Sequence, residues 1–127
     1  MKDVSVLTDN GVNLESALEL LGDLEFYDET LEAFLEENKT RIPNIQQYKN
    51  ERNMADYAIL VHALKSDSKY LGFMELADIA YQHEMASKAN NIDEVNAKYE
   101  LLMEMVDKYT GIANKYLGYE VVRWKRY

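Results

Sequence analysis

Cysteine is absent from this chain of 127 residues. Without a thiol the chain can form no disulfide, offer no thiolate to a metal and use no cysteine nucleophile. Proline occurs once and glycine five times, so residues that interrupt long helices are scarce. These absences favour a protein of long helices and suit the reducing cytoplasm, which is the location that we expect.

Positive charge is also scarce, with 14 Lys and Arg residues against 23 Asp and Glu residues and a formal net charge of −9. A negative surface repels phosphate backbones and anionic lipids, so we expect neither nucleic-acid nor membrane binding. No apolar run approaches the ~20 residues needed to cross a bilayer. The start, Met-Lys-Asp-Val, lacks a basic segment followed by an apolar core, so we expect no signal peptide.

Hydrophobic residues make up 47% of the chain, which is enough for a packed core in a domain of this size. We expect one domain over residues 1–127, with a core in about residues 11–117 and a tail at 118–127. The first ten residues look loosely ordered. The tail contains Arg123-Trp124-Lys125-Arg126, and its pattern leaves open whether it packs back or forms a flexible basic segment.

Capping residues and helix breakers divide the chain into helices. The expected segments are about 13–21, 23–39, 43–52, 53–70, 73–89 and 91–117. Asn13, Asp23, Asn53 and Asn91 are the expected N-caps, and Pro43 suits the first turn of its segment. Long helices with short connections predict an all-α fold: an up-down-up-down antiparallel four-helix bundle with a short N-terminal helix.

The helix expected over residues 54–70 carries a histidine on its outer side. At about 100° per residue, one arc of this helix must face the core. That arc holds Tyr57, Leu60, Val61, Leu64, Ser68 and Leu71. His62 lies well away from the arc and shares its face with Ala58, Lys65, Ser66 and Lys69. We therefore expect a solvent-exposed imidazole between small side chains.

An exposed imidazole is largely neutral near pH 7 and keeps a nucleophilic nitrogen lone pair. Lys65 follows His62 by three residues, the spacing of neighbours on one helix face, and can therefore meet the oxygens of a phosphoryl group on the ring. The simpler interpretation is an ordinary surface histidine between two lysines, and helical geometry alone does not exclude it.

The stretch from His62 to Gly72 resembles the signature of histidine phosphotransfer (Hpt) domains, His-x-(apolar)-Lys-Gly-x-(small)-x-x-(apolar)-Gly. The matching residues are His62, Leu64, Lys65, Ser68, Leu71 and Gly72. The resemblance covers about residues 11–117 and includes Leu76, Ala77, Glu84 and Lys88. The sequence departs from the family at Ser66, where the family has glycine, and at His83, where it usually has an apolar residue.

The resemblance implies a phosphocarrier that has no catalytic activity of its own. His62 would accept a phosphoryl group from a receiver-domain aspartate or a kinase, and pass it to another receiver. Lys65 and Lys88 would neutralise phosphate charge, and Glu84 would orient the ring or the lysines. The hydroxyl of Ser66 can donate a hydrogen bond to a phosphoryl oxygen.

The same resemblance implies which partners and groups surround the site. The partners would be response-regulator receiver domains, a hybrid sensor histidine kinase, or both, and the carrier itself would be a monomer. Mg²⁺ would belong to the receiver, so we expect no cofactor on this chain. The candidate docking residues are Leu14, Leu18, Leu21, Ala58 and Lys69.

Two other functions are alternatives to the phosphocarrier. A degenerate Hpt-like module would bind a receiver or kinase without phosphotransfer, and Ser66 in the glycine position is its best support. His83-Glu84-Met85-Ala86-Ser87 begins like the zinc-binding His-Glu-x-x-His motif, but Ser87 stands where the second histidine belongs. We therefore expect no metal site, and expect His83 to be packed and hydrogen-bonded.

Overall fold

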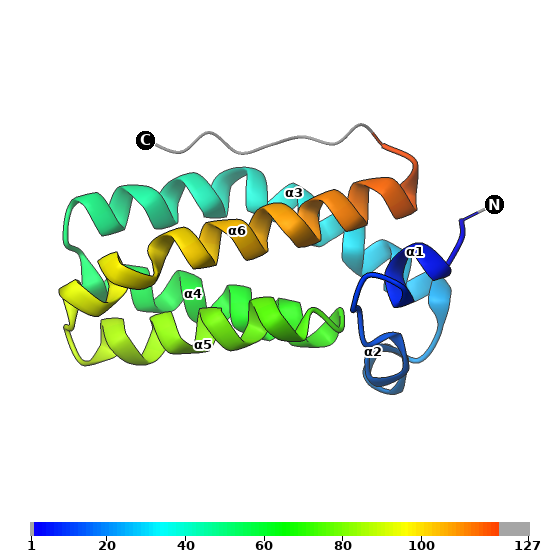
Figure 1. Cartoon of the computed structure of the whole chain (residues 1–127), viewed down its shortest axis with the longest axis horizontal. Helices are drawn as coiled ribbons and strands as arrows, with labels where there is room; N and C mark the ends of the chain where they lie inside the picture. The colour runs from blue at the N-terminus through cyan, green and yellow to red at the C-terminus, as the bar shows by residue number, and fades with distance from the viewer. Residues whose placement is uncertain (1, 120–127) are drawn as a thin grey trace.

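The computed structural model describes residues 2–119, and these residues form six helices. The helices are α1 (Ser5–Thr8), α2 (Leu14–Leu21), α3 (Leu24–Asn50), α4 (Met54–Tyr70), α5 (Met74–Lys88) and α6 (Ile92–Leu117). Figure 1 shows α3, α4, α5 and α6 side by side with alternating direction, while α1 and α2 lie at one end. The expected all-α antiparallel bundle with a short helix before it is confirmed.

Four of the helices begin at the side chains expected from the sequence. Asn13, Asp23, Asn53 and Asn91 each accept a hydrogen bond from the backbone N–H three residues further on. Such caps satisfy one of the backbone donors that a helix start leaves free. The sequence therefore sets the starts of α2, α3, α4 and α6 through local chemistry.

Gly72 closes the turn between α4 and α5 and also fixes α2. Its φ angle is 79°, a conformation that favours glycine. The backbone N–H of Asn13 donates to the Gly72 carbonyl over 2.9 Å, and a Cβ at Gly72 would overlap the carbonyl of Asn13. This close approach seats the start of α2 against the α4–α5 turn.

Helix α3 is longer than the sequence predicts. It runs unbroken through Pro43, so the expected end near Lys39 and new start at Pro43 are wrong. Proline has no N–H to donate and costs a helix interior about 3 kcal/mol. The side chains of Ile42 and Ile45 are buried beside it, and burial of about 1.5–3 kcal/mol each offsets that cost.

The N-terminal segment is also better ordered than expected. Residues Ser5–Thr8 form α1, and the side chain of Leu7 is fully buried. Val12 is buried as well, and α1 packs against α6. The expectation of a loose first ten residues is therefore wrong, because a single buried leucine anchors the segment.

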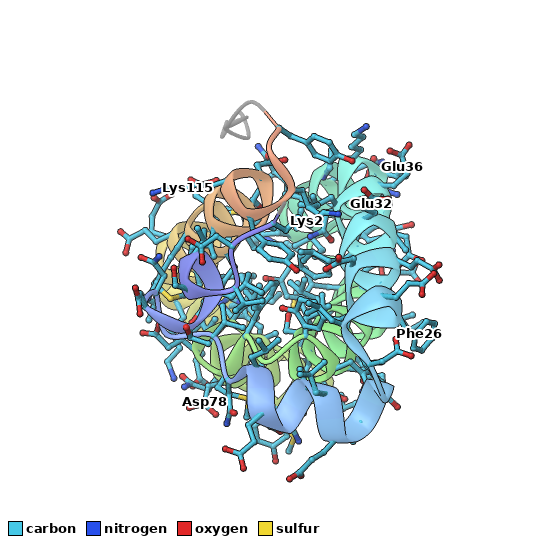
Figure 2. The ribbon with its side chains drawn as sticks, turned by 90° about the vertical axis from the view of Figure 1, so that its right-hand side faces the viewer. Lys2, Phe26, Glu32, Glu36, Asp78 and Lys115 are labelled. Carbon is cyan, nitrogen blue, oxygen red and sulfur yellow. The ribbon has the colours of Figure 1, made fainter. Side chains whose placement is uncertain are left out.

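Aromatic side chains hold the middle of the bundle together. Phe73 stacks on Tyr109 with ring centroids 4.7 Å apart and meets the edge of Phe34 at 5.6 Å. The hydroxyl of Tyr27 donates to the carbonyl of Leu71 over 2.8 Å. Figure 2 views the bundle from the α1–α2 end and shows side chains between the helices, with Phe26 pointing outward.

None of the helices within residues 2–119 combines the length and the apolar character that crossing a membrane requires. Helix α6 ends at Gly118, whose φ angle of 81° is left-handed, and this confirms the expected stop. The basic segment 123–126, whose packing the sequence left open, lies outside the described residues.

Candidate functional site: an exposed histidine on a buried carboxylate

His62 lies in the middle of α4 with its ring on the outer side. Its side chain is 55% exposed, whereas Val61 and Leu64 on the same helix are fully buried. Of the arc expected to face the core, only Leu60 is half-buried, and the other five members are buried. The predicted outward orientation of His62 is therefore confirmed.

Glu84 on α5 faces His62 and is almost completely buried, with a side chain only 3% exposed. Its Oε2 lies 2.7 Å from His62 Nδ1. It also accepts hydrogen bonds of 2.7 Å from the Lys65 ammonium at Oε1 and of 2.7 Å from the Lys88 ammonium at Oε2. Antiparallel packing of α4 and α5 on either side of the Gly72 turn brings these four residues together.

The charge on Glu84 follows from the balance of these contacts. Burial alone would raise its pKa, but the hydrogen bonds from Lys65, Lys88 and His62 outweigh burial and lower the pKa to about 2. Glu84 is therefore ionised at neutral pH. With two lysine cations and one carboxylate, the charged groups around the His62 ring carry a net positive charge on a protein whose total charge is −9.

The carboxylate also selects the tautomer of the ring. An ionised carboxylate can only accept hydrogen bonds, so in the neutral imidazole Nδ1 must hold the proton that His62 shares with Glu84. The lone pair then lies on Nε2, for which residues 2–119 offer no hydrogen-bond partner. The arrangement leaves a nucleophilic nitrogen on the accessible side of the ring.

An open groove of about 600 Å³ begins at His62 and runs between α4 and α5. Its lining includes Met54, Ala55, Ala58, Ile59, His62, Glu84, Ser87, Lys88 and Asn90. Ala58, which we expected on the open face, is instead buried in this groove, because α5 packs close to the small side chain. Ile59 is strongly exposed beside it, although it was not among the docking residues expected from the sequence.

The three leucines expected to form a docking patch on α2 are half-buried, so their docking role stays a prediction. Leu14, Leu18 and Leu21 pack against the core with part of each side chain still accessible, whereas Leu20 is exposed. The spacing of residues 14, 17, 18 and 21 is that of a buried helix face, so this signal was present in the sequence. Leu20 is the exposed apolar side chain of α2.

A second groove, of about 340 Å³, lies next to Leu20. It is lined by Ser16, Leu20, Ser66, Lys69, Tyr70 and Met74. The structure thus places Ser66 and Lys69 one and two turns beyond His62 on α4, in a groove that α2 completes. Ser66 is half-buried and Lys69 is exposed.

The other histidine, His83, is buried and fully hydrogen-bonded. Its Nε2 lies 2.9 Å from the Lys98 carbonyl, so Nε2 holds the proton and Nδ1 accepts from the Tyr57 hydroxyl at 2.8 Å. Burial lowers the pKa of His83. The expected packed histidine is confirmed, and residues 2–119 contain no cluster of three His, Cys, Asp or Glu side chains placed to hold a metal.

The sequence of the bundle matches the family model of the Hpt domain over residues 29–110. That match spans all of α4 and α5 and includes His62, Lys65, Glu84 and Lys88. The chain therefore belongs to the Hpt domain family, whose members act as phosphocarriers in phosphorelays and interact with receiver domains or kinases. No curated protein and no solved structure matches the chain.

Proposed function

We propose that Nε2 of His62 accepts a phosphoryl group from an aspartyl phosphate on a receiver domain, or from a hybrid sensor kinase, and passes it to another receiver domain. The observation that carries this proposal is the buried carboxylate of Glu84 on Nδ1, which leaves the lone pair on Nε2 of a largely exposed ring. An ordinary surface histidine has no need of such a partner.

The transfer step follows from this tautomer. The Nε2 lone pair forms the bond to phosphorus while the bond between phosphorus and the aspartate oxygen breaks, and the electron pair leaves with that carboxylate. Nδ1 keeps its proton, so the ring becomes positively charged. Glu84 lies 2.7 Å away and balances that charge, and the same steps in reverse deliver the phosphoryl group to the next aspartate.

The two lysine ammonium groups beside the ring would donate hydrogen bonds to the phosphoryl oxygens. Lys65 and Lys88 are held near His62 by their shared carboxylate, and each ammonium has further protons to donate. Ser66 follows His62 by one helical turn, and its hydroxyl would donate to the same oxygens. Mg²⁺ would remain on the receiver, because the acceptor nitrogen is already neutral and needs no metal to activate it.

The grooves on either side of His62 suit the surface of a docked receiver domain. Ile59 and Leu20 are the most exposed large apolar residues within residues 2–119. Ile59 lies on α4, the helix that carries His62, and Leu20 lies on α2, which completes the second groove. Lys69, in the second groove, adds a positive charge that complements an acidic receiver surface. The carrier would act as a monomer that engages one receiver at a time.

The test is to incubate the protein with a receiver domain that carries a radiolabelled aspartyl phosphate. The native chain should acquire the label, and the His62→Gln variant should acquire none. Gln82, an exposed α5 residue that contacts Lys98, gives a matched control, because Gln82→Ala should take up label as the native chain does. Equal labelling of His62→Gln and native protein would reject His62 as the acceptor.

A second candidate function rests on Ser66. Glycine in this position leaves more room for the phosphoryl group and the docked partner, so a serine there favours a module that binds a receiver or kinase without transfer. In that case a phosphorylated receiver would bind the chain and keep its label. Signalling in cells would then be unchanged by His62→Ala.

A further inference from the structure

The aromatic ring of Tyr81 covers the lysine that lies closest to the His62 ring. Tyr81 is on α5, three residues before Glu84, so both side chains are on one helix face. The Lys65 ammonium is 5.3 Å from the centroid of the Tyr81 ring and 2.7 Å from Glu84 Oε1. This places it within the range of a cation–π contact.

The two lysines that bind Glu84 differ in how tightly they are enclosed. The side chain of Lys65 is 19% exposed, whereas that of Lys88 is 56% exposed. Both donate hydrogen bonds of 2.7 Å to the same carboxylate, so Glu84 does not account for the difference. Tyr81 is the aromatic side chain over Lys65, and no ring lies over Lys88 within residues 2–119.

Enclosure matters because a lysine side chain has four rotatable bonds and normally keeps its ammonium in water. The Lys65 ammonium is 3.4 Å from His62 Nδ1, beside the ring that would carry the phosphoryl group. A lysine free to leave this position would contribute its charge only part of the time. The Tyr81 ring restricts the conformations that take Lys65 into solvent.

We propose that Tyr81 is a positioning residue, which holds the Lys65 ammonium beside His62 and thereby speeds phosphoryl transfer. This inference rests on the proposed function. In this proposal Tyr81 acts through its contact with Lys65 and not on the phosphoryl group directly. Its ring is exposed and supports the lysine from outside the core, so its replacement leaves the fold intact.

The first test measures the rate of transfer from a labelled receiver to the native chain and its variants. Tyr81→Leu removes the ring and should slow transfer by about two- to five-fold, the size of an exposed cation–π contact. Tyr81→Phe retains an aromatic face and should transfer at nearly the native rate. Tyr119→Leu is the matched control, because Tyr119 is an exposed tyrosine that contacts Glu32 on α3.

A double-mutant cycle separates positioning from a general structural effect. In a Lys65→Met background, Tyr81→Leu should have no further effect on the rate, because the residue through which it acts is gone. An equal slowing in both backgrounds would overturn the proposal. So would a native rate for Tyr81→Leu in the otherwise unchanged chain.

A measurement without any phosphoryl donor tests the same contact. In NMR spectra, the Lys65 side-chain protons nearest the ammonium should be shifted upfield by the Tyr81 ring, and Tyr81→Leu should return them to ordinary lysine values. Unshifted protons in the native chain would overturn the inference and leave the proposed function standing. A native chain that takes no label from the receiver would overturn both.

Discussion

The two histidines of this protein lie on neighbouring helices and differ in what their ring nitrogens contact. His83 has both nitrogens occupied, by the Tyr57 hydroxyl and the Lys98 carbonyl. His62 has one nitrogen on the Glu84 carboxylate and no partner for the other within residues 2–119, on a side chain that is 55% exposed. The first ring is a buried connection between helices, and the second is the proposed phosphoryl acceptor. The difference suggests a criterion: exposure together with one fixed ring nitrogen marks the proposed acceptor, whereas burial with both nitrogens bonded marks a structural histidine.

Replacing each histidine in turn is the strongest test of this comparison. His62→Gln should abolish label uptake and leave stability unchanged, because its ring is exposed. His83→Leu should leave the Tyr57 hydroxyl unpaired and remove the ring's hydrogen bond to the Lys98 carbonyl, at a cost of about 1–3 kcal/mol in the free energy of unfolding. Urea denaturation and transfer assays measure both variants. Loss of transfer by folded His83→Leu protein, or a large loss of stability in His62→Gln, would contradict the comparison.

Replacing the carboxylate tests the feature that sets His62 apart. Glu84→Met should slow transfer about 10- to 100-fold, because a hydrogen bond to a charged group of about 1.5–3 kcal/mol is lost. Glu84→Gln keeps an acceptor for Nδ1 but not the charge, so its rate should fall between those of Glu84→Met and the native chain. Stopped assays with a labelled receiver give the rates. Equal rates for Gln and Met would show that the charge alone matters.

The dependence of the unfolding free energy on pH should distinguish the buried His83 ring from the exposed His62 ring. Burial lowers the pKa of His83 in the folded chain, whereas an unfolded histidine titrates near 6.5. The unfolded state therefore binds more protons as pH falls below about 6.5, and the fold loses stability there. The unfolding free energy of the native chain should therefore decrease as the pH is lowered from 7 to 5. The decrease should be smaller in His83→Leu and should persist in His62→Gln.

The smallest effect is expected at Ser66, because substitutions there change the surroundings of His62 without altering the partners of its ring nitrogens. Ser66→Ala removes one donor and should slow transfer about three-fold with no change in the circular dichroism spectrum. Ser66→Gln adds bulk and should slow it further with the helices intact. Faster transfer by Ser66→Ala would instead show that the hydroxyl hinders the phosphoryl group.

The sequence predicted those parts of the molecule that depend on local periodicity. Asn13, Asp23, Asn53 and Asn91 cap helices through neighbouring backbone groups, so their positions alone locate the helix starts. The outward orientation of His62 likewise follows from the spacing of apolar residues on one helix. Its pairing with Glu84 was expected from the family resemblance, since periodicity says nothing about which helices face one another.

What the sequence did not reveal depends on contacts between distant segments. The break expected at Pro43 did not occur, because buried isoleucines beside it hold the helix together. Leu7 becomes part of the core only when α6 is in place. The contact between Tyr81 and Lys65 requires two helices packed in a particular register, which no pattern within either helix specifies.

The central claim is that the buried carboxylate of Glu84 occupies Nδ1 of His62 and leaves Nε2 to react. The most direct measurement is NMR of the phosphorylated chain with ¹⁵N-labelled histidine, which identifies the nitrogen bonded to phosphorus. The account predicts phosphorus on Nε2 of His62, with Nδ1 still protonated against Glu84. Phosphorus on Nδ1, or on any other residue, would contradict it.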